Sequence, residues 1–94
     1  MTIAVVGMGL IGGSLCRALK HYTPHRVLGT TRNQKTVAFA LSVGAIDAPM
    51  TDLSEPDVVF VALPPETTIE YLQAHVADFR PGTIVADICG VKQP

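Results

Sequence analysis

Residues 6–14 read VGMGLIGGS, and this stretch decides how the chain folds. Its glycines have the spacing G-x-G-x-x-G, after a short apolar run and before the helical apolar pattern of residues 11–22. Gly7 permits a tight turn, because glycine has no Cβ to restrict the backbone. Gly9 lets a ligand approach the main chain, and Gly12 lets the helix pack closely against the strand. The motif therefore predicts a strand, a tight turn and a helix in succession.

The rest of the chain alternates β-branched apolar runs with segments of helical period. Strands are predicted at 3–6, 27–30, 45–47, 58–63 and 83–88. Helices are predicted over 11–22, between the N-cap Asn33 and a stop at Gly44, and after Pro64-Pro65. Continuously apolar strands are typical of a parallel sheet covered on both faces, and right-handed crossovers give the strand order 3-2-1-4-5. We expect one α/β domain over residues 1–94, a doubly wound parallel sheet of Rossmann type.

Helical spacing also predicts which side chains face the core. The inward positions are Ile11, Leu15, Ala18, Leu19 and Tyr22 in the first helix, Val37, Ala40 and Leu41 in the second, and Ile69, Leu72 and Val76 in the third. Cys16 lies among the first set and is expected in or near the core. The last strand is expected to be buried, with nothing to cover the edge beyond it. Because an exposed apolar edge favours aggregation, we expect these residues to be the front part of a longer protein.

Composition excludes several classes of protein. Seven Lys and Arg against eight Asp and Glu give a net charge of −1 without clusters, so no surface for nucleic acid is expected. No apolar run reaches the roughly 18 residues of a membrane helix, and residues 1–9 do not resemble a secretory signal. Cys16 and Cys89 are too few for a disulfide framework or a zinc site. We therefore expect a cytoplasmic protein without a metal, nucleic-acid or membrane partner.

The glycine turn also predicts a ligand. A helix N-terminus offers unpaired N–H groups and a partial positive charge, which suit the diphosphate of a dinucleotide. We expect that group to be bound by the turn and the first helical residues, which are Gly7, Met8, Gly9, Leu10, Ile11 and Gly12. The alternative is a glycine-rich turn that only tightens the corner between strand and helix.

The end of the second strand indicates which dinucleotide is bound. NAD sites usually place a carboxylate there, about 20 residues after the glycine turn, to hold the ribose 2′-hydroxyl. Residues 29–33 read GTTRN and contain no carboxylate. A hydroxyl at Thr31 and a guanidinium at Arg32 suit a 2′-phosphate, because arginine offers forked charged donors. We expect NADP, with Thr30 and Asn33 completing the site. NAD is the alternative cofactor, and a merely solvated Arg32 is the alternative role for that residue.

The loop after the fourth strand lies at the carboxyl edge, where open α/β sheets bind ligands. Leu63, Pro64 and Pro65 are therefore expected to contact the cofactor, since prolines stiffen a loop against a flat ring or a ribose. Thr67 and Thr68 are predicted to cap the next helix rather than to touch the ligand.

No catalytic residue is predicted within the chain. His21, His25 and His75 are expected to face solvent. Cys89 is expected to pack rather than react, because nothing nearby would clearly lower the pKa of its thiol. Asp87 ends the last strand and is expected to hold loop backbone.

Three segments together resemble one family, the prephenate and arogenate dehydrogenases. Residues 7–15, GMGLIGGSL, closely resemble that family's glycine loop, G-x-G-L-I-G-G-S. Residues 62–65, ALPP, are similar to its proline-containing loop, and residues 87–92, DICGVK, are similar to the segment after its fifth strand. The resemblance spans the whole chain, and its first motif is the most specific.

The resemblance implies a dehydrogenase of tyrosine biosynthesis, in which a hydride passes to the nicotinamide while prephenate or arogenate loses CO2. It also implies a catalytic histidine in a later H-P-x-x-G segment, and a helical C-terminal domain that completes the substrate pocket and forms a homodimer. Neither feature is in these residues. The chain departs from the family's pattern at Gly90, where many members carry a serine that supports the histidine, and at Thr31, where NAD-using members carry an acid.

Two other functions remain open. Another NADP-dependent oxidoreductase, of the β-hydroxyacid dehydrogenase or imine-reductase type, would share the fold. So would a non-catalytic module that senses a nucleotide. An H-P-x-x-G segment further along the gene would favour the first function over both.

Overall fold

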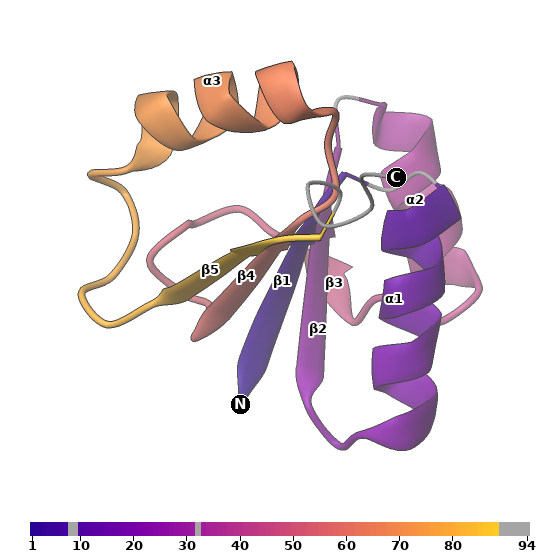
Figure 1. Ribbon diagram of the computed structural model, residues 1–94. Coiled ribbons are helices and arrows are strands. Elements are labelled where there is room, and N and C mark those ends of the chain that lie inside the picture. The colour runs from indigo at the N-terminus through magenta and orange to yellow at the C-terminus, as the bar shows by residue number, and fades with distance from the viewer. Residues whose placement is uncertain (8–9, 32, 89–94) are drawn as a thin grey trace.

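The computed structural model of the chain describes residues 1–7, 10–31 and 33–88. Its elements are, in chain order, β1 (Thr2–Val6), α1 (Leu10–Tyr22), β2 (Arg26–Thr30), α2 (Gln34–Ser42), β3 (Ala48–Pro49), β4 (Val58–Val61), α3 (Pro65–His75) and β5 (Ile84–Asp87) (Figure 1). The strands form one parallel sheet in the order β3-β2-β1-β4-β5. The predicted fold class and strand order are therefore confirmed.

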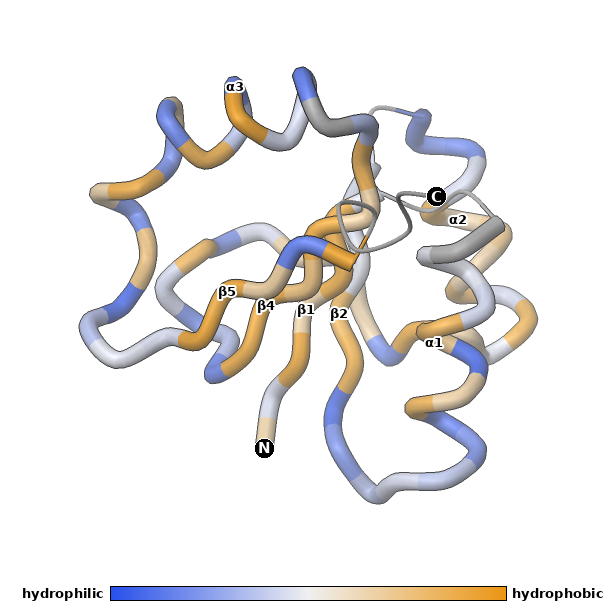
Figure 2. Tube along the Cα trace, in the orientation of Figure 1, coloured by the Kyte–Doolittle hydropathy of each residue, from blue (hydrophilic) through white to orange (hydrophobic). Residues whose placement is uncertain are grey.

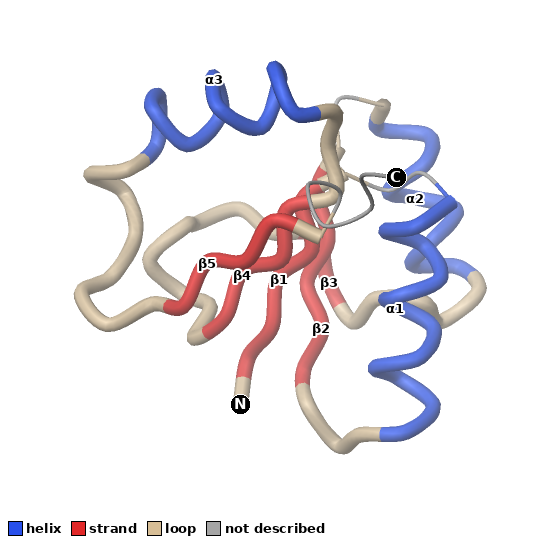
Figure 3. Tube along the Cα trace, in the orientation of Figure 1, coloured by secondary structure: helices blue, strands red, loops and turns tan. Residues whose placement is uncertain are grey.

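Helices lie on both faces of this sheet (Figure 3). On one face, Cys16 of α1 and Val37 of α2 pack with Val5 and Val27 of the central strands. On the other face, a second cluster contains buried strand residues together with Leu72 of α3. The sheet is thus the middle layer of three, as a doubly wound fold requires.

The central strand is buried on both faces. Ala4 and Val5 point to opposite faces, and neither is exposed to solvent. Figure 2 shows that hydrophobic residues follow the strands, whereas hydrophobic and hydrophilic residues alternate along the helices. A continuous apolar run therefore predicts the position of β1 correctly.

Both predicted ends of α2 are confirmed. The Asn33 side chain accepts a hydrogen bond from the Lys35 N–H at 3.0 Å, which is the N-cap arrangement. Gly44 has a φ of +76° just after the helix, a conformation that favours glycine.

The third strand is displaced from its predicted position at 45–47. Ala45 and Ile46 instead fill the core cluster beside α2, and the strand itself is the two-residue β3 that follows them. Apolar residues that enter the core after a helix look like a strand in sequence, and only their packing separates the two.

Five predicted core side chains are exposed, and one of them is Ala18 of α1. Tyr22 is 80% exposed, Leu41 39%, Ile69 56% and Val76 71%. Each lies on the outer side of its helix or at its end, because the packed face is narrower than the apolar pattern suggests. In α3 that face carries Thr68, which is buried, and its half-buried neighbours Tyr71 and Leu72.

The last strand is less buried than its sequence predicts. Ile84 is 62% exposed and Val85 is 36% exposed. The reason is position: β5 is the edge strand beside β4, and α1 contacts β1 and β2 while α2 contacts β3. The expected uncovered edge is therefore present among the described residues.

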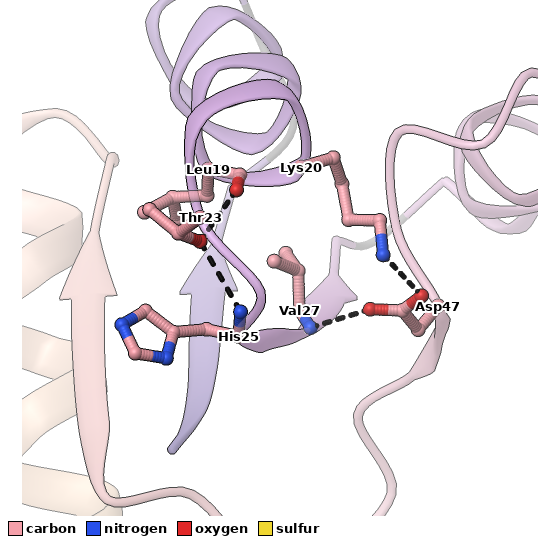
Figure 4. Close-up of polar contacts among 6 residues, drawn as sticks. All are labelled: Leu19, Lys20, Thr23, His25, Val27 and Asp47. Atoms are coloured by element: carbon pink, nitrogen blue, oxygen red, sulfur yellow. Dashed lines mark hydrogen bonds and ion pairs between the residues drawn. The ribbon is translucent and has the colours of Figure 1, made fainter.

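At the amino ends of the strands, two aspartates bind backbone N–H groups. Asp47 accepts a hydrogen bond from the Val27 N–H at 2.7 Å and from the Lys20 ammonium at 2.6 Å (Figure 4). Asp57 accepts one from the Thr2 N–H at 2.9 Å, and its other oxygen pairs with Arg80. These bonds join β2 and β1 to the loops that precede β3 and β4.

Candidate functional site

A cavity of about 670 Å³ lies at the carboxyl ends of β1, β2 and β4. Its size is within the range of small-molecule sites, roughly 300–1,000 Å³. One wall comes from the strand ends and their loops, and the other comes from α3. The residues that line it are Val6, Gly7, Thr30, Thr31, Leu63, Pro64, Thr67, Glu70, Tyr71 and His75.

Gly7 is the residue at which three strand ends meet. It has a φ of +95°, and a Cβ added there would lie 2.5 Å from the Ala62 carbonyl oxygen and 2.9 Å from Leu63 Cδ2. Its N–H donates to the Thr30 carbonyl oxygen at 2.8 Å. The turn after β1 is therefore held between the end of β2 and the loop after β4, and only glycine fits there.

Gly12 brings α1 against the same turn. A Cβ on Gly12 would lie 1.9 Å from the Gly7 carbonyl oxygen, closer than any two such atoms can approach. The first turn of α1 contains no acidic side chain, so no carboxylate offsets the positive end of the helix. The arrangement leaves the helix N-terminus suited to an anion beside the cavity.

Most of the predicted site residues come together. Gly7, Thr30, Thr31, Leu63 and Pro64 line the cavity, and Gly12 contacts the turn beneath it. Leu10 and Ile11 are the first two residues of α1, and Pro65 is the first residue of α3. Met8, Gly9 and Arg32 lie outside the described residues.

Asn33 is engaged by a neighbouring helix. Its side chain caps α2, and it does not line the cavity. That Asn33 contacts the cofactor stays a prediction, and its amide oxygen is already engaged by the Lys35 N–H in the first turn of α2.

The two threonines after the prolines differ from each other. Thr68 is 3% exposed, and its hydroxyl donates to the Leu63 carbonyl oxygen at 3.0 Å. The residue at the N-cap of α3 is Pro64, without a side-chain capping bond, so the predicted cap is wrong. Thr67 lines the cavity instead, because it lies on the neighbouring side of the helix.

Three residues of α3 belong to the cavity although the sequence did not single them out for it. Glu70, Tyr71 and His75 follow Thr67 at helical spacing, so all four lie along one side of α3. The rings of Tyr71 and His75 have centroids 4.5 Å apart, tilted by 43°. The only signal in the sequence was that spacing, directly after a loop already expected to bind a ligand.

His75 is therefore not simply a solvent-facing residue. Its Nδ1 lies 3.0 Å from Asp78 Oδ2, and its ring is half-buried against the cavity. Burial, and secondarily the charge of Asp78, raise the pKa of the neighbouring Tyr71, so this phenol is neutral at physiological pH. His21 is exposed and His25 half-buried, and neither lines this cavity.

The buried thiol is not reactive. Cys16 has no exposed surface, and burial raises the pKa of its thiol to about 11, as expected for a core residue. In the described ranges, no three His, Cys, Asp or Glu side chains are grouped closely enough to hold a metal ion. None of the helices described is long and apolar enough to cross a membrane. Cys89 and Gly90 lie outside the described residues.

The fold, the glycine turn and the cavity at the strand ends together define a nucleotide-binding domain of the doubly wound α/β class. The family of prephenate dehydrogenase nucleotide-binding domains matches residues 15–94, which is most of the chain. The chain belongs to this family.

Similarity to individual proteins agrees with this family membership. The chain is 31% identical to the prephenate dehydrogenase of Bacillus subtilis (strain 168), over 98% of the chain and 26% of that protein. It is 32% identical to the crystal structure of Synechocystis arogenate dehydrogenase, with a TM-score of 0.85 over 94% of the chain and 32% of that structure. The chain thus spans about a quarter of the first relative and a third of the second.

A third comparison supports the fold alone. The structure of prephenate dehydrogenase from A. aeolicus, in complex with hydroxyphenyl propionate and NAD+, is 24% identical to the chain. It superimposes with a TM-score of 0.82 over 93% of the chain and 32% of that structure.

Proposed function

We propose that the cavity binds NADP, and that the chain is the cofactor-binding domain of a prephenate or arogenate dehydrogenase. The observation that supports this most directly is the convergence of Gly7, the end of β2 and the loop after β4 on one cavity, with α1 packed against Gly7. In this arrangement the diphosphate lies against the main chain of the glycine turn and the N-terminus of α1.

The choice of NADP rests on the end of β2. Thr30 and Thr31 line the cavity there, and neither they nor Arg32 offers the carboxylate that would hold an unphosphorylated ribose. A threonine hydroxyl and the arginine beside it in sequence both donate hydrogen bonds to phosphate oxygens. NAD remains the alternative that the experiment below distinguishes.

The reaction follows from the family. A hydride passes from the substrate ring to the nicotinamide as CO2 is lost, and this chain's part is to hold and orient the dinucleotide. The groups that act on prephenate or arogenate would come from the rest of the enzyme, so the 94 residues bind the cofactor without turnover. Reduction of NADP by these residues alone, on addition of either substrate, would contradict this division.

The cofactor assignment is tested by titrating NADP and NAD separately, with calorimetry as the measurement. We expect tighter binding of NADP, and we expect Arg32→Ala to weaken NADP by about 1–3 kcal/mol while changing NAD much less. A matched control is Arg17→Ala, since Arg17 is exposed on α1 and does not line this cavity. Tighter binding of NAD, or equal losses for the two cofactors in Arg32→Ala, would refute the assignment.

A further inference from the structure

We propose that Glu70 of α3 recognises the exocyclic amino group of adenine, and so selects an adenine dinucleotide over one with hypoxanthine. This inference rests on the proposed function, because it assumes that the cavity holds the adenosine half of the cofactor. It assigns a role to a wall of the cavity that the glycine motif and the end of β2 do not explain.

The first step is where the base must lie. With the diphosphate at Gly7 and the ribose phosphate at Thr31, the adenosine ribose lies at the strand-end wall of the cavity. A base attached to that ribose points away from the sheet edge. The opposite wall of the same cavity is the side of α3 that carries Glu70, Tyr71 and His75.

The second step is what that wall offers to a flat base. The half-buried Tyr71 and His75 rings, 4.5 Å apart, form an aromatic surface on α3. Planar rings pack well against aromatic side chains, and such packing does not depend on which base is present. The aromatic pair therefore explains why a base would bind here, but not which one.

The third step is the carboxylate. Glu70 adjoins Tyr71 in sequence and also lines the cavity, and among the described residues it has no hydrogen-bond or ion-pair partner. An ionised carboxylate only accepts hydrogen bonds, so its partner must be a donor. At C6 adenine carries an amino donor, whereas hypoxanthine carries a carbonyl oxygen at that position, which a carboxylate repels.

Charge supports the same assignment. A carboxylate close to the 2′-phosphate would oppose NADP binding, so Glu70 must lie on the base side of the ribose if the proposed cofactor is correct. The amino group of the base is then the donor within its reach. A charge-assisted hydrogen bond of this kind, at a partly exposed site, changes affinity by roughly tenfold.

The experiment compares NADP with nicotinamide hypoxanthine dinucleotide phosphate, measured by calorimetry on the full chain. We expect wild type to prefer the adenine form by roughly tenfold. Glu70→Ala should reduce this preference to less than about threefold by weakening the adenine form, and Glu70→Gln should keep part of it because its amide oxygen still accepts. The matched control is Glu66→Ala, an exposed glutamate on α3 that does not line the cavity, and it should keep the full preference.

Three results would overturn the inference. They are equal affinities of wild type for the two dinucleotides, an unchanged preference in Glu70→Ala, and equal losses of both forms in that variant, which would place the carboxylate on the ribose. A failure of the proposed function would look different, because wild type would then bind neither dinucleotide.

Discussion

The two ends of the parallel sheet use their polar groups in opposite ways. At the amino ends, Asp47 and Asp57 accept hydrogen bonds from the backbone of β2 and β1 and pair with basic side chains. At the carboxyl ends, the side chains of Thr31 and Glu70 face a cavity and bond to no other described residue. Asp47 and Asp57 are thus bound within the fold itself, whereas Thr31 and Glu70 remain available to a ligand.

This difference explains how one small domain combines stability with binding. A buried N–H without a partner is destabilising, so the amino ends need their aspartates. The carboxyl ends are held instead by backbone contacts around Gly7, which require no side chains. Substitutions at the two ends should therefore have separable effects on unfolding and on cofactor affinity.

The largest effect is expected at the glycine turn. Gly12→Ala places a methyl group 1.9 Å from the Gly7 carbonyl oxygen, so the start of α1 must move away from β1. We expect a loss of at least about 3 kcal/mol in the free energy of unfolding, measured with urea, together with loss of NADP binding.

The control for the glycine turn is Gly44→Ala. Gly44 has a positive φ but no atoms within 4 Å of an added Cβ, so that variant should lose only about 1–2 kcal/mol. A Gly12→Ala protein as stable as Gly44→Ala would show that the close packing of α1 on the turn is not required.

An intermediate effect is expected at the opposite end of the sheet. Asp47→Ala removes the acceptor of the buried Val27 N–H, and we expect a loss of about 1–2 kcal/mol in the free energy of unfolding. The affinity for NADP should be unchanged, since Asp47 is remote from the cavity lining. If Asp47→Ala lost as much NADP affinity as stability, the two ends of the sheet would not have separable effects.

The variant Asp47→Asn separates the charge of Asp47 from its hydrogen bond, because asparagine keeps an acceptor but cannot ionise. The measurement is the free energy of unfolding as a function of pH. The Lys20 ammonium, and then the Val27 N–H, hold the pKa of Asp47 below its usual range. The charged form therefore stabilises the fold above about pH 4, and this contribution is lost as the pH falls through the lowered pKa. Wild type should lose more stability than Asp47→Asn between pH 5 and about pH 3, and parallel profiles would contradict the role of the charge.

The smallest effect is expected at the exposed ion pair of the amino end. Arg26 and Glu55 pair across the surface, and each side chain is at least 40% exposed. Because water screens such pairs, Glu55→Gln should change the free energy of unfolding by less than about 0.5 kcal/mol, and the change should vanish in 1 M salt. A larger, salt-independent loss would mean that this ion pair stabilises the amino ends of the strands as much as Asp47 does.

The sequence predicted the cavity wall formed by the strand ends better than the cavity wall formed by α3. Gly7, Thr31 and Pro64 follow directly from a motif or from the end of a strand, and all three line the cavity. Glu70 and His75 were missed because their place depends on how α3 lies over the strand ends. The apolar pattern of α3 also favoured Ile69, which is exposed, over Tyr71, which packs against the sheet.

What the sequence determined by itself was the order of elements, the turn at Gly7 and the interior position of Cys16. These features depend on periodicity and on steric limits between residues close along the chain, so a short stretch of sequence is enough to predict them. Only the tertiary structure decided which side of α3 faces the cavity and which aspartates bind the backbone N–H groups at the amino ends of the strands. Lys20 and Asp47 are 27 residues apart, and Thr2 and Asp57 are 55 apart. Contacts over such separations leave no local pattern, because they arise only when the crossovers bring the strand ends together.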